Sequence, residues 1–133
     1  MDTGTPDPTH VEAAAFFDAF VQAFATFDGA QVARRYFAPY LARHGDGSLD
    51  CFSDPTQIAA YFQRILDAYH ERGCRSCAYE SLDVSGMGRD CLLATVTWSL
   101  LQGNGSLVAR WRESYSLART PDGLKIFASV DHA

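Results

Sequence analysis

Apolar side chains recur at helical spacing in the first part of the chain. Phe17, Phe20 and Phe24 follow one another at steps of three and four residues. This spacing places them on one face of a helix, which we expect to cover residues 10–26. Thr9 stands immediately before this stretch and can serve as the N-cap. The sequence therefore predicts an amphipathic first helix with an aromatic face.

Two further helices are predicted before the middle of the chain. The first is short, covers residues 30–37 and is ended by Pro39. The second begins after Asp54, which can cap it, with Pro55 at its first position, and it ends at Gly73. The apolar face of this helix repeats at i, i+3, i+4, i+7, i+8 and i+11 and comprises Ile58, Tyr61, Phe62, Ile65, Leu66 and Tyr69.

The second half of the chain alternates between apolar and polar positions, as half-buried strands do. Because Gly-rich or Pro-Asp-Gly turns separate these stretches, consecutive strands must pair antiparallel. Strands of a dozen residues would be roughly 40 Å long if straight, so we expect them to curve. Residues 40–44 and 48–52 form either a hairpin or an irregular loop. The four predicted strands are 76–85, 90–102, 106–119 and 124–131.

Helices first and strands afterwards indicate an α+β fold rather than alternating βαβ units. The chain has 133 residues, 47% of them apolar and 20% charged, which fits a single domain. We expect that domain to cover residues 10–133, and we expect residues 1–9, an acidic and Pro-rich stretch, to form a disordered tail. Aromatic residues make up 13% of the chain, enough to fill a core or to line an apolar pocket.

Charge argues against two classes of partner. The net charge is −5 and the chain contains a single lysine, Lys125, while its arginines are scattered. A nucleic-acid surface needs clustered cations, and so does an acidic membrane surface, so we expect neither partner. No apolar run is long enough to cross a bilayer, and the first residues lack the features of a signal peptide. The sequence therefore predicts a cytoplasmic protein.

The sequence carries no cofactor or metal motif, and we expect neither group. The four histidines stand far apart, and no glycine-rich nucleotide-binding motif occurs. Cys74 and Cys77 form a CxxC, which occurs in redox pairs and in zinc sites. A redox CxxC lies between a strand and a helix, whereas this one follows a helix. Cys51 and Cys91 are isolated, so reduced thiols are the simplest interpretation.

The order of elements and two motifs resemble a known family. Phe52-Ser53-Asp54-Pro55 opens the third helix, and the chain ends on the long strand at 111–119, an Asp-Gly turn, and a strand that finishes at Asp131-His132. This arrangement is similar to the nuclear transport factor 2-like superfamily, and within it to SnoaL-like domains of the polyketide cyclase and steroid isomerase type. Leu124 departs from the Trp that is more common there.

The resemblance implies a cystatin-like cone, in which about three N-terminal helices pack on a strongly curved, mixed but mainly antiparallel sheet. It also implies a homodimer formed through that sheet. The superfamily includes isomerases, cyclases, dehydratases and hydrolases as well as non-catalytic domains, so the fold leaves the activity open.

Glu113 is the main catalytic candidate. Alternation along the strand at 106–119 places Leu107, Ala109, Trp111, Glu113, Tyr115 and Leu117 on one face, which should look into the cone. A carboxylate on that face would lose solvation and its pKa would rise, which suits a general acid or base. The alternatives are that Glu113 forms a structural ion pair with an arginine, or that it lies in water at the rim of the cone.

Other side chains could complete a pocket. Tyr115 could donate a hydrogen bond, and His44 with Asp50 could form an acid–base pair if the hairpin brings them together. An exposed loop histidine is the alternative. Asp131 and His132 could also act from the last strand, or could simply be frayed terminal residues. The side chains expected to contact a ligand are Trp98, Trp111, Tyr61, Tyr40, Phe52 and Phe20, although aromatics on an apolar face also serve as core.

These observations predict a pocket for an apolar small molecule, with cofactor-independent acid–base chemistry on a hydrophobic carbonyl compound. The alternative is a non-catalytic binding or dimerisation module whose cone is filled by its own aromatics. A cavity beside Glu113 favours the first interpretation, and an arginine paired with Glu113 in a filled cone favours the second.

Overall fold

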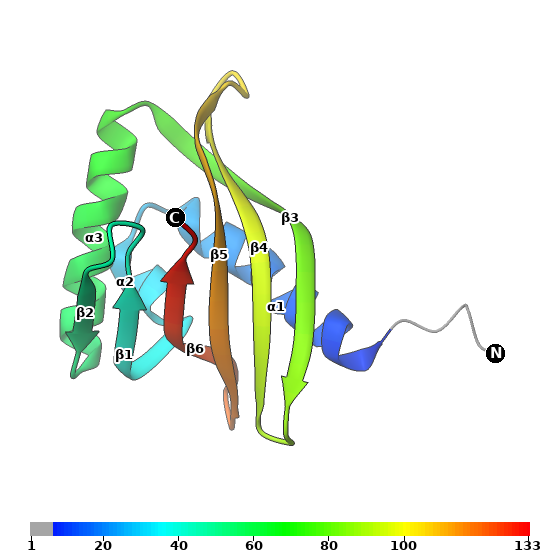
Figure 1. Ribbon diagram of the computed structural model, residues 1–133. Helices are drawn as coiled ribbons and strands as arrows, with labels where there is room; N and C mark the ends of the chain where they lie inside the picture. Colours follow the sequence, from blue (N-terminus) through cyan, green and yellow to red (C-terminus); the bar gives the residue numbers. More distant parts are fainter. Residues whose placement is uncertain (1–6) are drawn as a thin grey trace.

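The computed structural model describes residues 7–133, which form three helices and one six-stranded sheet (Figure 1). The helices precede most of the strands, as predicted. The helices are α1 (Pro8–Phe24), α2 (Gly29–Ala33) and α3 (Pro55–Glu71). The strands are β1 (Tyr36–Arg43), β2 (Leu49–Phe52), β3 (Cys74–Met87), β4 (Cys91–Gln102), β5 (Leu107–Thr120) and β6 (Gly123–Asp131).

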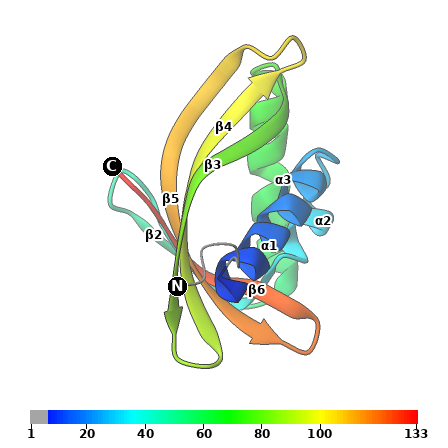
Figure 2. The ribbon, with the colours of Figure 1, turned by 90° about the vertical axis from the view of Figure 1, so that its right-hand side faces the viewer.

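The strands are arranged in the order β2-β1-β6-β5-β4-β3. β1 and β6 run parallel, and every other neighbouring pair is antiparallel. β1 and β2 form a hairpin, one of the two alternatives that the sequence left open. Figure 2 shows that the long strands β3, β4 and β5 bend over the helices, all of which lie on the concave side. The predicted α+β fold with a curved, mixed and mainly antiparallel sheet is therefore confirmed.

Helix α1 begins two residues earlier than the sequence pattern predicts. The Asp7 carboxylate, rather than Thr9, caps it by accepting a hydrogen bond from the backbone N–H of Thr9 at 2.9 Å, and Pro8 occupies the first turn. Residues 8 and 9 of the expected tail are thus helical, and residues 1–6 of that tail lie outside the described residues. Helix α3 begins as predicted, since Asp54 accepts from the N–H of Gln57 at 2.9 Å.

The prediction for the second helix was wrong at its C-terminal end. Helix α2 stops at Ala33, and Tyr36 already belongs to β1, although a helix was expected over residues 30–37. Pro39 lies inside β1, in the stretch where the register with β6 shifts between Tyr36 and Leu41. A proline has no N–H to donate, so it is tolerated in a strand at such an irregularity.

The core lies between the concave face of the sheet and helices α1 and α3. On β4 every second residue is buried, namely Leu92, Ala94, Val96, Trp98 and Leu100. From α1, the ring of Phe17 packs against Trp98 and Tyr115 at centroid distances of 5.9 and 5.5 Å. The predicted alternation of apolar and polar positions therefore gives this strand one buried face. Because β4 pairs with β5, the same buried face continues onto β5.

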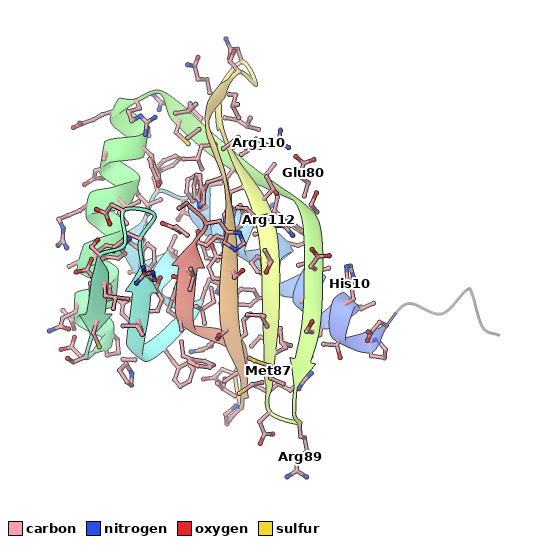
Figure 3. The ribbon with its side chains drawn as sticks, viewed as in Figure 1. His10, Glu80, Met87, Arg89, Arg110 and Arg112 are labelled. Carbon is pink, nitrogen blue, oxygen red and sulfur yellow. The ribbon has the colours of Figure 1, made fainter. Side chains whose placement is uncertain are left out.

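The convex face of the sheet carries charged side chains at one end. Arg110 forms an ion pair with Glu80, and Arg112 bonds to Asp83 at 2.7 Å. Figure 3 shows Arg110 and Arg112 on the side of the sheet turned away from the helices. The side chains of Arg110 and Arg112 therefore cannot pair with acidic residues on the inward face. Among residues 7–133, no helix has the length and hydrophobicity needed to cross a membrane.

Candidate functional site

A cavity of about 320 Å³ lies between the concave face of the sheet and helices α1 and α3. Phe, Tyr and Trp side chains form much of its wall, and its lining also includes the exposed residues Arg43, Gly45 and His132. Arg43 ends β1, Gly45 lies in the turn that follows, and His132 comes directly after β6. This turn and the end of β6 lie side by side in both views (Figures 1 and 2). The cavity therefore opens between the β1–β2 turn and the C-terminus.

Glu113 extends from β5 into this cavity and is only 8% exposed. Side chains next to it on the same face of the sheet form hydrogen bonds, either with Glu113 itself or with each other. The indole N–H of Trp111 donates to Oε1 of Glu113 at 2.9 Å, and the indole N–H of Trp98 donates to the hydroxyl of Tyr115 at 2.7 Å. The predicted inward position of Glu113, between Trp111 and Tyr115, is thus confirmed.

A second carboxylate faces the first. Asp131 of β6 is the direct cross-strand partner of Glu113 in the sheet register, and both line the cavity. Directly opposed residues on one face are close enough for their side chains to interact. Among residues 7–133, no arginine or lysine forms an ion pair with either carboxylate. The alternative in which Glu113 is neutralised by an arginine is therefore not what the structure shows.

These surroundings change the proton affinity of Glu113. Burial raises the pKa of Glu113 to about 8, and the negative charge of Asp131 adds to the rise. Hydrogen bonds from Trp111 and Tyr115 stabilise the ionised form and partly oppose both effects. Glu113 consequently holds a proton near neutral pH, so the pair can offer an acid and a base together.

Tyrosine hydroxyls surround the two carboxylates. The hydroxyl of Tyr40 lies 2.6 Å from Oγ of Ser129, which is buried on β6. Burial raises the pKa of Tyr36, Tyr40 and Tyr61 above the ordinary value and raises that of Tyr69 to about 12. These phenols stay protonated at neutral pH and can donate hydrogen bonds to an oxygen atom in the cavity.

His44 and Asp50 lie together near the opening. Nε2 of His44 is 2.7 Å from Oδ2 of Asp50, so the hairpin does bring the two residues into contact. His44 lines the cavity, whereas Asp50 does not and reaches the cavity only through His44. An acid–base role for this pair stays a prediction.

The predicted ligand contacts divide into two groups. Phe20, Tyr40, Tyr61, Trp98 and Trp111 all line the cavity. Phe52 does not line it. Its ring packs behind the wall, at centroid distances of 4.5 Å from Tyr61 and 5.7 Å from Tyr40. The short strand β2 adds to the outer edge of the sheet, which keeps Phe52 one layer away from the cavity.

Sequence reasoning did not give Asp131 a place opposite Glu113. Strict alternation from the buried Ile126 would point residue 131 outward. The register between β5 and β6 shifts between Ser116 and Leu117, so β6 carries an extra residue and Ser129 is buried as well. Such a bulge reverses the faces of the residues that follow it. The only signal in the sequence was the acidic residue near the end of the last strand.

The cysteines form no site with histidine or acidic residues. Within residues 7–133, no three His, Cys, Asp or Glu residues are grouped as metal ligands. All four cysteines are free, and Cys77 lines the cavity. Burial raises the pKa of the Cys77 thiol to about 12, so it is protonated at neutral pH and acts as a small apolar wall residue.

One described family and several solved structures are similar to this chain. The family described as "NTF2-like protein (DUF6841)" matches residues 11–133. No curated protein matches the chain. Aln2 from a Streptomyces species superposes with a TM-score of 0.76 at 16% identity over 96% of this chain and 92% of Aln2.

Two further structures have a similar fold. A putative dehydratase of the NTF2-like family from Streptomyces avermitilis gives a TM-score of 0.68 at 17% identity, over 96% of this chain and 97% of that one. An NTF2-like protein with a cystatin-like fold from Novosphingobium aromaticivorans gives 0.73 at 13% identity, over 93% and 80% of the two chains. At these identities the likeness concerns the fold alone.

Proposed function

The chain belongs to the NTF2-like protein family (DUF6841), and on this fold we propose that its cavity binds an apolar small molecule and transfers protons on it without a cofactor. The observation that supports this proposal is the pair of opposed carboxylates, Glu113 and Asp131, in an aromatic cavity with no cation paired to either among the described residues. Such a pair supplies an acid and a base within reach of one ligand.

A hydrophobic carbonyl compound fits this arrangement best. The ionised carboxylate would take a proton from the carbon next to the carbonyl group, and the protonated carboxyl would return one elsewhere on the same molecule. Negative charge develops on the carbonyl oxygen during the first step. Tyrosine hydroxyls that line the cavity, those of Tyr115 and Tyr61 among them, would stabilise that oxygen by donating hydrogen bonds, and His44 could do so near the opening. Trp98 and Trp111 would hold the apolar body of the substrate.

The alternative is a non-catalytic module that only binds a ligand. A cone filled by its own aromatics would have supported a dimerisation module without a ligand, whereas about 320 Å³ beside Glu113 supports binding of a small molecule. Binding and catalysis then differ in whether the carboxyl pair exchanges protons with the ligand.

Proton exchange can be measured without knowing the natural substrate. We would incubate the protein with acetophenone or α-tetralone derivatives bearing exchangeable protons next to the carbonyl group, in D₂O, and follow deuterium incorporation by NMR. The wild-type protein should accelerate exchange, and Glu113→Gln should lose about a hundredfold or more of that rate, the usual contribution of a general acid or base.

Glu80→Gln is the matched control, because Glu80 pairs with Arg110 on the opposite face of the sheet. Its exchange rate should equal that of the wild-type protein. Equal rates for Glu113→Gln and wild type would remove Glu113 from the mechanism. Ligand binding with no exchange in any variant would leave the binding module as the function.

We also propose that the chain forms a homodimer through the convex face of the sheet. One row of the register across four strands contains only apolar or small side chains: Leu93, Ser116, Ala128 and Leu41. Both leucines are exposed. A second copy of the same face would cover them, consistent with a symmetric dimer.

A further inference from the structure

We propose that the cavity also binds a small organic cation, a protonated amine that carries an aryl or similar apolar group, with the ammonium held between Glu113 and Asp131. This inference rests on the premise, shared with the proposed function, that the cavity admits a ligand. It does not depend on proton transfer to a carbonyl compound. It adds a class of ligand that would compete with any neutral substrate for the same space.

The carboxylate pair lacks a cation of its own among the residues that the structure describes. Glu113 and Asp131 oppose each other across β5 and β6 and project into the same cavity. Arg110 and Arg112 of β5 point to the other face, where they pair with Glu80 and Asp83, and Arg119 of β5 pairs with Glu12 of α1. Two adjacent carboxylates in a partly dry site cannot both be ionised without a compensating positive charge. A proton on Glu113 supplies that charge in the free protein, and a ligand ammonium can replace it.

The walls suit an organic cation. The rings of Trp111 and Tyr69 lie 6.4 Å apart, and Tyr36 and Tyr40 lie 4.7 Å apart, all four around the same cavity. Aromatic faces attract ammonium groups, and clusters of them bind alkylated amines. The phenol oxygens can also accept hydrogen bonds from an ammonium N–H. The remaining volume is lined by apolar side chains, which would contact the aryl group.

Binding of a cation should therefore release a proton. The acidic group that exchanges it is Glu113, whose pKa is raised to about 8 by burial and by Asp131. The other titratable groups that line the cavity are the tyrosines of β1, α3 and β5, which stay neutral, then Cys77, and finally Arg43, His44 and His132 near the opening. Below about pH 8, amine affinity should increase by up to about tenfold for each unit by which the pH rises, because fewer protons then compete with the ammonium group for the carboxylate pair.

Isothermal titration calorimetry of the full chain tests the inference with two probes of similar shape. Benzyldimethylamine is protonated at neutral pH, and acetophenone is neutral. We expect the amine to bind at least tenfold more tightly at pH 8 than at pH 6, with proton release detected as a dependence of the heat on the ionisation enthalpy of the buffer. Acetophenone affinity should not change over this range.

Glu113→Gln should weaken amine binding at least tenfold and abolish the proton release, and Asp131→Asn should weaken amine binding at least tenfold because one of the two carboxylates that hold the ammonium is lost. Glu80→Gln should bind both probes as the wild-type protein does. If acetophenone binds and the amine does not, the inference is wrong and the proposed function stands. If the amine binds equally well to both cavity variants, it binds elsewhere and the inference is also wrong. If neither probe binds, the shared premise fails and both proposals fall.

Discussion

At the scale of single residues, the account depends on a carboxyl group placed where water is scarce. Glu113 is 8% exposed, accepts a hydrogen bond from Trp111, and faces a second carboxylate rather than a cation. Desolvation and like charge both favour the protonated form, and two hydrogen bonds do not offset them. A group whose folded-state pKa exceeds its unfolded value stabilises the fold at low pH and loses that contribution as the pH rises.

The stability of the protein should therefore depend on pH through Glu113. The pKa of this residue rises from 4.5, the ordinary value, to about 8 on folding. Between these two values, the wild-type protein should lose up to about 1.4 kcal/mol of stability per pH unit relative to Glu113→Gln, which cannot ionise. Urea unfolding at pH 5, 6, 7 and 8, followed by tryptophan fluorescence, measures the difference. Curves that stay parallel across this range would contradict the prediction.

Sequence alternation was sufficient to place Glu113 but not its partner. The pattern on β5 is regular around Trp111, Glu113 and Tyr115, so an inward face could be predicted. The pattern on β6 is interrupted by a bulge, and no residue near it indicates that bulge. The inward position of Asp131 could therefore not be predicted. Phe52 was misplaced for a related reason, because alternation gives a face and not the layer in which a side chain packs.

At the scale of elements, the shape of the cavity depends on how closely α2 and α3 approach. Gly29 begins α2, and a Cβ built on it would lie 2.5 Å from the carbonyl oxygen of Ala59 and 2.7 Å from the backbone nitrogen of Gln63. Gln63 also accepts a hydrogen bond from the N–H of Gly29 at 2.7 Å and donates to the carbonyl oxygen of Phe27. No side chain fits in this contact without moving a helix backbone.

Gly29→Ala should therefore destabilise the fold by about 1–3 kcal/mol, the usual effect of overpacking. Gly86→Ala is the control, because a Cβ at Gly86 meets no atom within 4 Å, and its stability should change by less than about 1 kcal/mol. Chemical denaturation of the two variants provides the comparison. A Gly29→Ala protein as stable as the control would mean that α2 and α3 are not held this close.

The elements were predictable where periodicity and capping agreed. Helix α3 has Asp54 and Pro55 at its start and Gly73 after its end, and the four long strands lie within a few residues of the predicted ones. The boundary between α2 and β1 was not predictable. Tyr36 fits a helical face as well as a strand, and only its burial in the cavity wall and the parallel pairing of β1 with β6 decide between them.

At the scale of the whole molecule, the convex face of the sheet offers a test of the proposed dimer. Leu93→Glu would place a charge in the apolar row and should convert a dimer into a monomer, since like charges would meet across a symmetric interface. Leu107→Glu is the control, because Leu107 is also an exposed leucine but lies outside that row. Sedimentation velocity at one protein concentration measures both. A monomeric wild-type protein would refute the dimer.

The overall arrangement could be predicted from the resemblance and from the order of the elements, whereas the activity could not. One fold can host many unrelated activities, and the side chains that enter the cavity determine its chemistry. In this chain these side chains are two carboxylates and a ring of tyrosines. The protonation of Glu113 at neutral pH underlies both the proposed proton transfer and the inferred binding of amines.

The most direct measurement is an NMR titration of the glutamate side chains, with ¹³C-labelled glutamate in the wild-type protein and Glu113→Gln for assignment. We predict that the resonance of Glu113 titrates with a pKa near 8, as burial and Asp131 require. A value at or below the ordinary 4.5 would show that Glu113 is ionised and compensated at neutral pH, and it would contradict the account.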